Sequence, residues 1–425
     1  MMESCGLARR RLANALTVAL MAGASMSSSA ADDGEGAFQA GVDKLWMEAG
    51  YVFDHPDASG TGLIHGAVSA KGSLRSIEYA LGARFDANAQ FGDRDFTRTR
   101  ADYGENYLRW RDDSTRLTIG TQNVLWGRVD EISPIDRMSR ADLTRIVLDK
   151  LPERRRAVPA LRLERFTDDF KIDAVWLPTF DDAVMPDRRS VWSPVDTREG
   201  RLLGIGDLPL MKGFRVKDAE HDTGGGGIRV TRGGDDVDYG FSIQRVRQSQ
   251  PYYRVTPGVL QAVHPYSTVV GAEFEAERLG ATWRMEAAWS SDVPVTTRGF
   301  QFLTKPGFDM VVGAEFFPGD AETRVTLQLG GHKTFVDDRV LERKEIYTFN
   351  GEIEHPFAHG RWRADLRFVV GLDQRDLYLN PKLTYTGFDQ HELFIAAHLF
   401  DGAEKTLGGY YDRNDSVMVG WQAKF

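Results

Sequence analysis

The last nine residues, Val417 to Phe425 (VMVGWQAKF), decide the fold. Apolar side chains alternate with polar or small ones along this stretch, and a period of two is the signature of a β-strand with one apolar face. The apolar face, which includes the terminal Phe425, consists of Val417, Val419, Trp421 and Ala423. The other face carries Gly420, Gln422 and Lys424. The stretch therefore predicts an amphipathic strand that ends on an aromatic residue.

The same alternation recurs through the chain, in runs of about ten residues. Each run sets apolar residues on one face and charged or small residues, such as Glu78, Arg284 and Asp365, on the other. The apolar residues of the clearest runs are Ile77, Tyr79, Leu81, Ala83 and Phe85; Phe170, Ile172, Ala174 and Trp176; Trp283, Met285, Ala287 and Trp289; Met310, Val312, Ala314 and Phe316; and Trp362, Ala364, Leu366, Phe368 and Val370. Such runs predict an antiparallel sheet with one apolar and one charged face.

The composition by itself resembles that of a soluble protein. Of the 425 residues, 42% are hydrophobic and 27% are charged, and the mean hydropathy is −0.37. These values exclude a disulfide scaffold, a disordered chain, a coiled coil and a protein built from several membrane helices. They agree with a membrane β-barrel, in which only every second strand residue faces lipid. No apolar stretch after residue 31 is long enough for a transmembrane helix.

The links between the runs alternate in length. Short links occur at 71–73, 112–115, 167–169, 233–236, 278–280, 318–320, 355–360 and 387–390. Longer links mostly fall between them, at 54–61, 86–104, 124–159, 178–222, 248–266, 291–307, 334–344, 372–376 and 401–415. This phase is typical of a barrel with periplasmic turns and extracellular loops. It gives about 18 strands, or about 16 if one hairpin is merged.

The first 31 residues predict a secretory signal peptide. Three arginines precede the apolar run Leu12–Gly23, and small residues ending in two alanines follow it, as at a cleavage site. The alternative is an amino-terminal helix of a soluble domain. The single cysteine, Cys5, lies before the apolar run, so residues 32–425 would form a cysteine-free exported chain.

The terminal Phe425 indicates which class of β-sheet protein this is. An alternating last strand that ends on an aromatic residue resembles that of bacterial outer-membrane barrels, which the outer-membrane assembly machinery reads. Together with the signal peptide, it predicts an all-β protein: one transmembrane antiparallel β-barrel domain, residues 32–425, in the outer membrane of a Gram-negative bacterium. The alternatives are an edge strand that ends in Phe by chance and an exported two-sheet domain.

The inner face of such a barrel is wet, so the charged faces of the runs predict a charged lumen. Inward bases are expected at Arg109, Arg111, Arg116, Arg162, Lys171, Arg229, Arg361, Arg363 and Arg367. Inward acids are expected between them, at Glu273, Glu275, Glu286, Asp309, Glu315, Glu352 and Glu354. Closing the sheet would set a largely basic arc opposite a largely acidic one and make the pore charge-selective. The alternative is that these charges are solvated, or paired across neighbouring strands, and select nothing.

Two insertions break the strand rhythm, at 124–160 and 178–222. In the first, Ser139 is expected to cap a short helix that runs to Lys150, with the basic run Arg154, Arg155 and Arg156 after it. Inside the barrel this insertion would form a constriction whose arginines attract anions; as a surface lid it would let them contact lipopolysaccharide phosphates. A solvated turn is the third reading. The second insertion contains four prolines and is expected to be an irregular loop.

The run from Gly120 to Gly127 (GTQNVLWG), followed by Asp130, Asp136, Asp142 and then Arg154 to Leu161, resembles an uncharacterised family of Gram-negative outer-membrane porin-like proteins. That family shares a strand ending in Gln-x-x-x-Trp-Gly, an Asp-rich loop and a return strand. The whole layout is more loosely similar to alginate-export-type barrels and substrate-specific porins. The resemblance implies a monomer of about 18 strands.

These features favour a porin-like channel that lets hydrophilic solutes, among them acidic ones or an acidic polymer, pass by diffusion or export. Its expected partners are the lipid bilayer, lipopolysaccharide and the assembly machinery. We expect no enzyme activity, cofactor, metal or nucleic-acid partner, because no HExxH, GxSxG or CxxC motif occurs. An outer-membrane hydrolase, and a structural or surface-binding barrel without transport, are the alternatives.

Overall fold

The computed structural model describes residues 38–425 except 130, 132, 220–222, 235 and 320–321. The signal peptide predicted at 1–31 lies outside the described residues. No helix in the described part of the chain is both long and apolar enough to cross a membrane.

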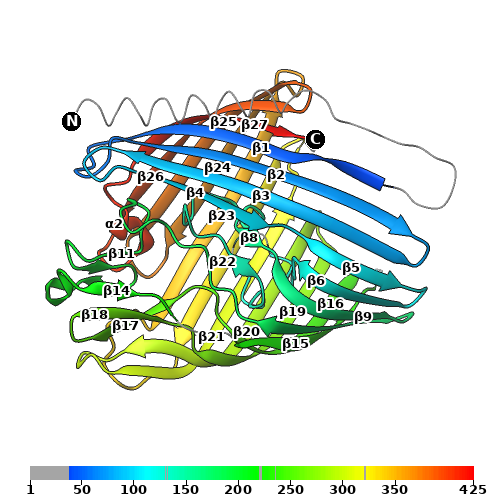
Figure 1. The fold of residues 1–425 in the computed structure, drawn as a ribbon, viewed down its shortest axis with the longest axis horizontal. Helices are drawn as coiled ribbons and strands as arrows, with labels where there is room; N and C mark the ends of the chain where they lie inside the picture. Colours follow the sequence, from blue (N-terminus) through cyan, green and yellow to red (C-terminus); the bar gives the residue numbers. More distant parts are fainter. Residues whose placement is uncertain (1–37, 130, 132, 220–222, 235, 320–321) are drawn as a thin grey trace.

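The wall of the molecule is a closed antiparallel β-barrel of 18 strands, which confirms the predicted fold class and strand number (Figure 1). Both β4 and β5 pair with β3, so they count as one interrupted strand. The strands are β1 (Phe38–Val52), β2 (Gly60–Leu74), β3 (Ile77–Phe91), β4 (Phe96–Tyr103), β5 (Asn106–Arg111), β6 (Thr115–Gln122), β9 (Val158–Phe166), β10 (Phe170–Thr179), β15 (Thr223–Arg232), β16 (Val237–Arg247), β19 (Tyr266–Arg278), β20 (Ala281–Thr296), β21 (Phe302–Phe316), β22 (Arg324–Thr334), β23 (Glu345–Phe357), β24 (Trp362–Gly371), β25 (Asp376–Phe388), β26 (His391–Gly402) and β27 (Ser416–Lys424).

The last strand closes the barrel. In the β1–β27 ladder, Lys44 pairs with Lys424 and Val52 with Ser416, so the two ends of the sheet satisfy each other's backbone groups. An open edge could not find these hydrogen bonds in lipid. Phe425 lies just past β27, is 53% exposed and places its ring against that of His391. This position agrees with an outward-facing terminal residue, and its role as an assembly signal stays a prediction.

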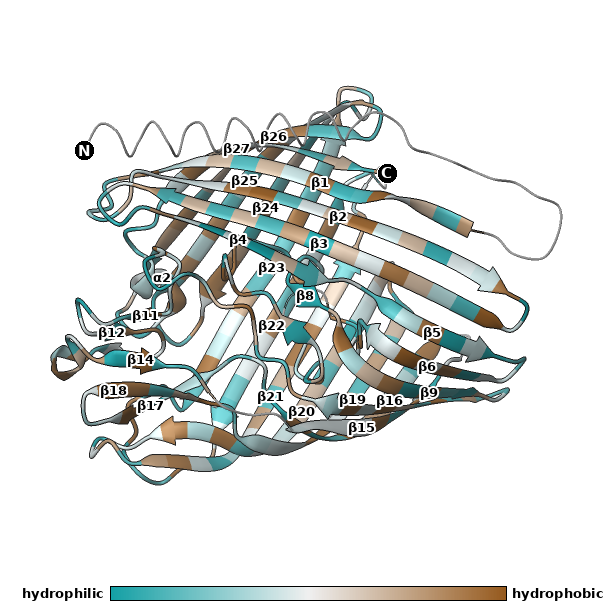
Figure 2. Ribbon diagram, in the orientation of Figure 1, coloured by the Kyte–Doolittle hydropathy of each residue, from teal (hydrophilic) through white to brown (hydrophobic). Residues whose placement is uncertain are grey.

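The strands of the barrel have the apolar outer face and the polar inner face that the alternation predicts. Outward residues such as Leu81, Trp176 and Val419 are exposed, and Figure 2 shows apolar and polar bands alternating along β1, β2 and β3. Their neighbours in sequence, such as Ala80 and Met418, are buried on the inner side. The apolar outer band, the closed sheet and its wet interior place the protein in the outer membrane of a Gram-negative bacterium.

The two ends of the barrel differ as the link lengths predict. The short hairpin turns lie at one end, and the long links gather at the other, which we call the mouth (Figure 1). The four longest links, all at the mouth, are 123–157, 180–222, 248–265 and 403–415. Two predicted loops are wrong in part, because β3 and β4 occupy most of 86–104 and β20 and β21 most of 291–307. In β3 two of the three outward residues there are alanines, Ala87 and Ala89, so the alternation is weak in the sequence.

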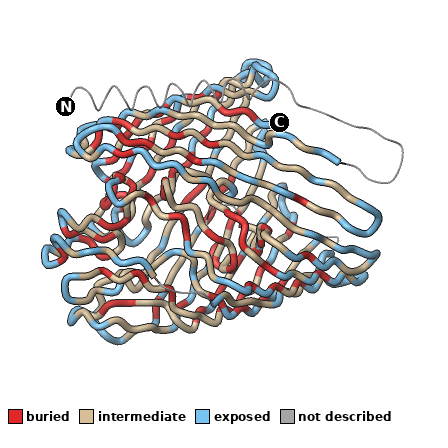
Figure 3. The backbone as a smooth tube through the Cα atoms, viewed as in Figure 1, coloured by how far each residue is buried: buried red, intermediate tan, exposed pale blue. Residues whose placement is uncertain are grey.

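The mouth carries small secondary elements of its own. The second insertion holds β11, β12, β13, a 3-10 helix and β14, and the link 248–265 holds β17 and β18, which join β14 in one small sheet. Figure 3 shows exposed residues at the loop and hairpin tips of both ends. The bounds are β11 (Val195–Asp196), β12 (Arg201–Leu202), β13 (Gly206–Asp207), η1 (Pro209–Met211), β14 (Arg215–Lys217), β17 (Tyr252–Thr256), β18 (Val259–Val263) and, before β27, α2 (Leu407–Tyr410).

The orientation of the barrel gives a first test. Lys212 is exposed at the mouth, and Leu279 is 97% exposed in the turn between β19 and β20. With Cys5 replaced by Ser, Lys212→Cys should react with a membrane-impermeant maleimide on intact cells, because the mouth faces outward. Leu279→Cys should react only after the outer membrane is opened. Labelling of Leu279→Cys, and not Lys212→Cys, on intact cells would contradict this orientation.

Candidate functional site

The first insertion folds into the barrel. It spans residues 123–157 between β6 and β9, and we call it the inner loop. Two short strands, β7 (Arg140–Ala141) and β8 (Arg155–Arg156), pair within it and lie inside the wall in Figure 1. Of the three readings left open by the sequence, the structure has the infolded one.

The helix predicted from Ser139 to Lys150 is wrong. Residues 143–154 form successive turns, and Ile146 adopts a positive φ of 51°, which a right-handed helix does not allow. The Ser139 hydroxyl donates to Asp136, and the Asp142 carboxylate accepts from the Thr144 N–H at 3.0 Å. These side-chain bonds to nearby groups favour turns over helix.

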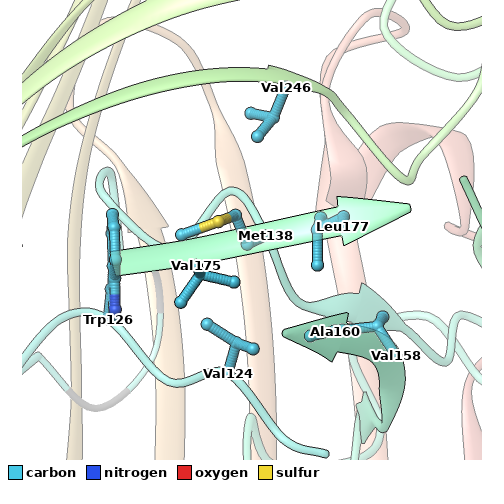
Figure 4. Close-up of a cluster of buried hydrophobic side chains, with 8 residues drawn as sticks. All are labelled: Val124, Trp126, Met138, Val158, Ala160, Val175, Leu177 and Val246. Atoms are coloured by element: carbon cyan, nitrogen blue, oxygen red, sulfur yellow. The ribbon is translucent and has the colours of Figure 1, made fainter. Parts of the chain in front are cut away.

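The Gln-x-x-x-Trp-Gly run forms the root of the inner loop. Trp126 is 1% exposed, and its Nε1 donates to Asp173 on β10 at 3.0 Å. A Cβ on Gly227 would lie 3.1 Å from the Trp126 ring, so glycine at that wall position leaves room for the indole. Figure 4 shows Trp126 among buried apolar side chains of the loop and the wall. The cluster comprises Val124, Trp126, Met138, Val158, Ala160, Val175, Leu177 and Val246.

Glu286 on β20 anchors the loop by its backbone. It is fully buried, accepts from the Val129 N–H at 2.9 Å and from the Ser133 hydroxyl at 2.6 Å, and also accepts from the Arg128 N–H. Gly127, with φ of 119°, turns the chain toward this carboxylate. The carboxylate of Glu286 therefore binds the inner loop and does not face an open pore.

Arg128 pairs with two acids of the predicted acidic arc, Glu273 and Glu275. Its guanidinium lies 2.8 Å from Asp238, 3.3 Å from Glu273 and 3.3 Å from Glu275. Glu273 also pairs with Arg229 from β15. Two predicted lumen residues of opposite charge thus face each other within the wall, and the loop supplies a further cation. Such charge-assisted contacts fix the loop against the strands.

The tip of the inner loop reaches the wall at β19 and β21. Ile135 packs against Gly271, where a Cβ would lie 2.5 Å from its Cγ2 atom. Arg137 forms an ion pair with Asp309 at 2.9 Å. The other oxygen of Asp309 lies 2.7 Å from His332 Nδ1. Glycine at position 271 therefore permits the close approach that brings Arg137 to Asp309.

The second half of the loop contacts the opposite wall. Arg145 pairs with Glu48 on β1, and Lys150 with Glu352 on β23. Arg367 on β24 is 3% exposed; it donates to the Val147 carbonyl and pairs with loop residue Glu131 at 3.3 Å. Contacts from one loop to strands on both sides of the barrel mean that it crosses the lumen.

The arginine triplet is paired within this network. Arg154 lies 4.0 Å from Glu131, and Arg155 lies 3.0 Å from Asp136. Arg156 contacts Asp142, Asp86 at 2.7 Å and Asp102 at 2.9 Å, and its side chain is 1% exposed. The proposed contact of these arginines with lipopolysaccharide is wrong, because they lie inside the wall.

Four of the remaining predicted bases are paired with carboxylates of the wall. Arg109 and Arg111 pair with Glu78, Arg162 with Asp173 and Arg363 with Asp365. Arg116 lies exposed with its guanidinium over the Phe166 ring. Arg361 was expected to point inward from a strand, but it lies exposed in the turn before β24. The predicted separation into a basic and an acidic arc is replaced by local pairing, since bases and acids alternate along the strands and the loop adds cations on the acidic side.

Three carboxylates meet at β23 and β24: Glu352, Glu354 and Asp365 have oxygens within 4.8 Å of one another. Lys150 lies 3.5 Å from Glu354, and Arg324 contacts the same carboxylate. The cationic side chains of Lys150 and Arg324 thus compensate the negative charge of this cluster. We read this cluster as part of the network that anchors the loop.

The second insertion closes one side of the mouth. The Trp192 ring centroid lies 5.8 Å from those of Phe400 and Tyr411, and the Tyr411 hydroxyl donates to the Trp192 carbonyl. Burial raises the pKa of Tyr411 well above its ordinary value. These rings join Ile146 and Leu148 of the inner loop in one apolar cluster.

Sequence reasoning missed the loop's own partners. Arg128, Arg137 and Arg145 contact carboxylates on strands more than 90 residues away in the sequence, so no local pattern marks them. Two of the three aspartates in the family-like run do mark the site, because Asp136 binds Arg155 and Asp142 binds Arg156. Asp130 lies outside the described residues.

The sequence matches no protein-family model and no curated protein. The family-like run therefore stays a prediction.

Solved structures share the architecture. OccAB2 of Acinetobacter baumannii superposes with a TM-score of 0.52 at 10% identity, over 91% of this chain and 98% of that one. OccAB4 of the same organism gives 0.51 at 10% identity, over 94% and 100%. OpdQ of Pseudomonas aeruginosa gives 0.49 at 8% identity, over 93% and 99%. At these identities the likeness concerns the fold alone, and the two OccAB structures confirm the predicted resemblance to porin-type outer-membrane barrels at that level.

Proposed function

We propose that the protein is a porin-like diffusion channel for small hydrophilic solutes, and that the inner loop sets its size limit. The observation that carries the proposal is the inner loop itself, which crosses the lumen and is bound by charged groups to strands on both sides. A loop that served only to fill the barrel could have been apolar. Charged groups on the loop and the wall can line a hydrated passage, which suits selective permeation.

The proposal does not include a filter for acidic solutes made of the predicted arginines. Arg109, Arg162, Arg363 and the triplet Arg154 to Arg156 all have carboxylate partners. Paired charges attract a passing anion less than free ones do. We place the selectivity instead in the space that the inner loop leaves open. A monomer and lipopolysaccharide as an outer-leaflet partner remain predictions.

For the hydrolase alternative, the described residues contain a series of an aspartate, a histidine and a hydroxyl group that lie within hydrogen-bond distance of one another. His332 Nδ1 lies 2.7 Å from Asp309, and its Nε2 lies 2.9 Å from the Thr334 hydroxyl. Thr334 is 5% exposed, and its backbone N–H donates to Lys344, so that group is not available to an oxyanion. Asp309 is also paired with Arg137. We therefore propose no covalent chemistry for this site.

Planar-bilayer recording tests the channel directly. Residues 32–425, folded from detergent, should give discrete conductance steps. Removal of most of the inner loop, with residues 124–154 replaced by a short glycine–serine link, should raise the conductance at least several-fold, because the loop occupies the lumen. Absence of conductance from both proteins would contradict the proposed function, and equal conductance would contradict the role of the loop.

Loosening a single anchor of the inner loop should also raise the conductance, but by less than removal of the loop does. Glu286→Ala removes the acceptor of the Arg128 and Val129 N–H groups and of the Ser133 hydroxyl. Hydrogen bonds to a charged group contribute about 1.5–3 kcal/mol each, so the loop should become mobile and the current noisier and larger. Glu277→Ala, at an exposed position near the turn of the same hairpin, is the matched control. Identical recordings from the two variants would argue against anchoring by Glu286.

A further inference from the structure

Two adjoining cavities lie beside the inner loop on the β19–β22 side of the barrel. The outer cavity, beneath the second insertion, has a volume of about 270 Å³. The inner cavity, next to the tip of the inner loop, has a volume of about 300 Å³, at the lower end of the range for small-molecule sites. The residues that line both cavities are Gln250, Pro251, Tyr252, Val293, Pro294 and His332. The two cavities therefore adjoin at these residues, one toward the mouth and the other toward the tip of the inner loop.

Among the described residues, packed side chains occupy other parts of the cross-section. The apolar cluster around Trp192 and Tyr411 occupies the β25–β27 side, and the cluster around Trp126 occupies the β9–β16 side. A cavity near β1–β3, lined among others by His65 and Asn88, has only about 30 Å³, the space of one or two water molecules. Of these inner cavities, the two beside β19–β22 are large enough for a small solute.

The floor of the inner cavity is the ion pair of Arg137 and Asp309, with His332 beside it. Arg137 comes from the inner loop, whereas Asp309 and His332 come from the wall. Asp292 also lines the inner cavity, where it accepts from the Thr304 hydroxyl at 3.1 Å. A solute that moves beyond this cavity has to pass groups of both signs.

The linings define the chemistry of the solute. The outer cavity is largely apolar, with Leu202, Ile205, Val295 and Ile346 among its residues. The charged groups of the two cavities are balanced: Arg137, Arg343 and Lys405 against Asp292, Asp309 and Glu342. Balanced charges beside an apolar wall suit a dipolar molecule with an apolar group and disfavour a solute with a single net charge, which gains one partner and meets one repulsion.

We propose that these two cavities form the solute path and that they take small zwitterionic solutes carrying an apolar group. The proposal rests on the channel function above and assigns its course and its substrate class. The anionic end of the solute would share Arg137 with Asp309, and the cationic end would share Asp292 with Arg245, which lies 3.7 Å from it. The outer cavity would take the apolar group. The Arg137–Asp309 pair then acts as the gate between the inner cavity and the rest of the lumen.

The path is tested by cysteine modification, because the only cysteine of the chain is Cys5. In a Cys5→Ser background, Val293→Cys lies where the two cavities meet, and Asn88→Cys lies in the small cavity near β1–β3. A charged methanethiosulfonate reagent should remove most of the conductance of Val293→Cys and leave that of Asn88→Cys nearly unchanged. Block of Asn88→Cys alone, or of neither variant while the unmodified channels conduct, would overturn the path.

The solute class is tested by swelling of proteoliposomes in three solutes of nearly equal size: leucine, leucinamide and 4-methylpentanoate. Leucine should enter several-fold faster than the cation or the anion, and Arg137→Gln together with Asp292→Asn should remove that preference. Equal rates for the three solutes, or fastest entry of either ion, would overturn the assigned class. Absence of conductance from the unsubstituted protein would instead contradict the proposed channel function. Failure of the channel function and failure of the assigned solute class are therefore distinguishable.

Discussion

A sheet that faces lipid cannot keep an open edge, and this constraint determines the rest of the molecule. Because β1 has to pair with β27, the sheet closes and acquires an inner face that lipid never reaches. That face can carry charge, and here it carries many charged side chains. The same closure leaves a space in the middle, and the inner loop occupies it. The charged wall and the charged loop are therefore two consequences of one requirement of the backbone.

The wall and the inner loop depend on each other electrostatically. A buried charge without a partner is strongly destabilising, whereas a pair with good geometry is tolerated. Glu273 receives both Arg128 and Arg229, and Arg156 lies among Asp86, Asp102 and Asp142. Such pairs specify where the loop lies more than they add stability. The space that is left lies against β19–β22, because elsewhere the loop and the mouth insertion pack apolar groups against the wall.

The sequence was sufficient for the fold because a barrel strand is a local pattern. The alternation around Val419 or Trp289 needs no knowledge of distant residues, and the link lengths supply the topology. It failed where the pattern weakens, as at 86–91, where the outward residues Ala87 and Ala89 gave little contrast before Phe91. It also failed where the decisive partner is remote: the Arg154 to Arg156 run looks like a free anion site, and only the fold brings Glu131, Asp136 and Asp86 to it. Local helix signals after Ser139 were overridden in the same way.

The central claim is that the inner loop lies across the lumen with its tip on β19, and a designed disulfide measures this directly. An ideal Cβ on Gly271 lies 3.3 Å from the Cβ of Ile135, close to the separation of a disulfide. With Cys5 replaced by Ser, Ile135→Cys and Gly271→Cys should form a cross-link in the folded protein, seen as a change in mobility of the denatured chain that thiol reduction reverses. The pair Leu148→Cys and Gly271→Cys should not cross-link. A cross-link through residue 148, or none through residue 135, would contradict the account.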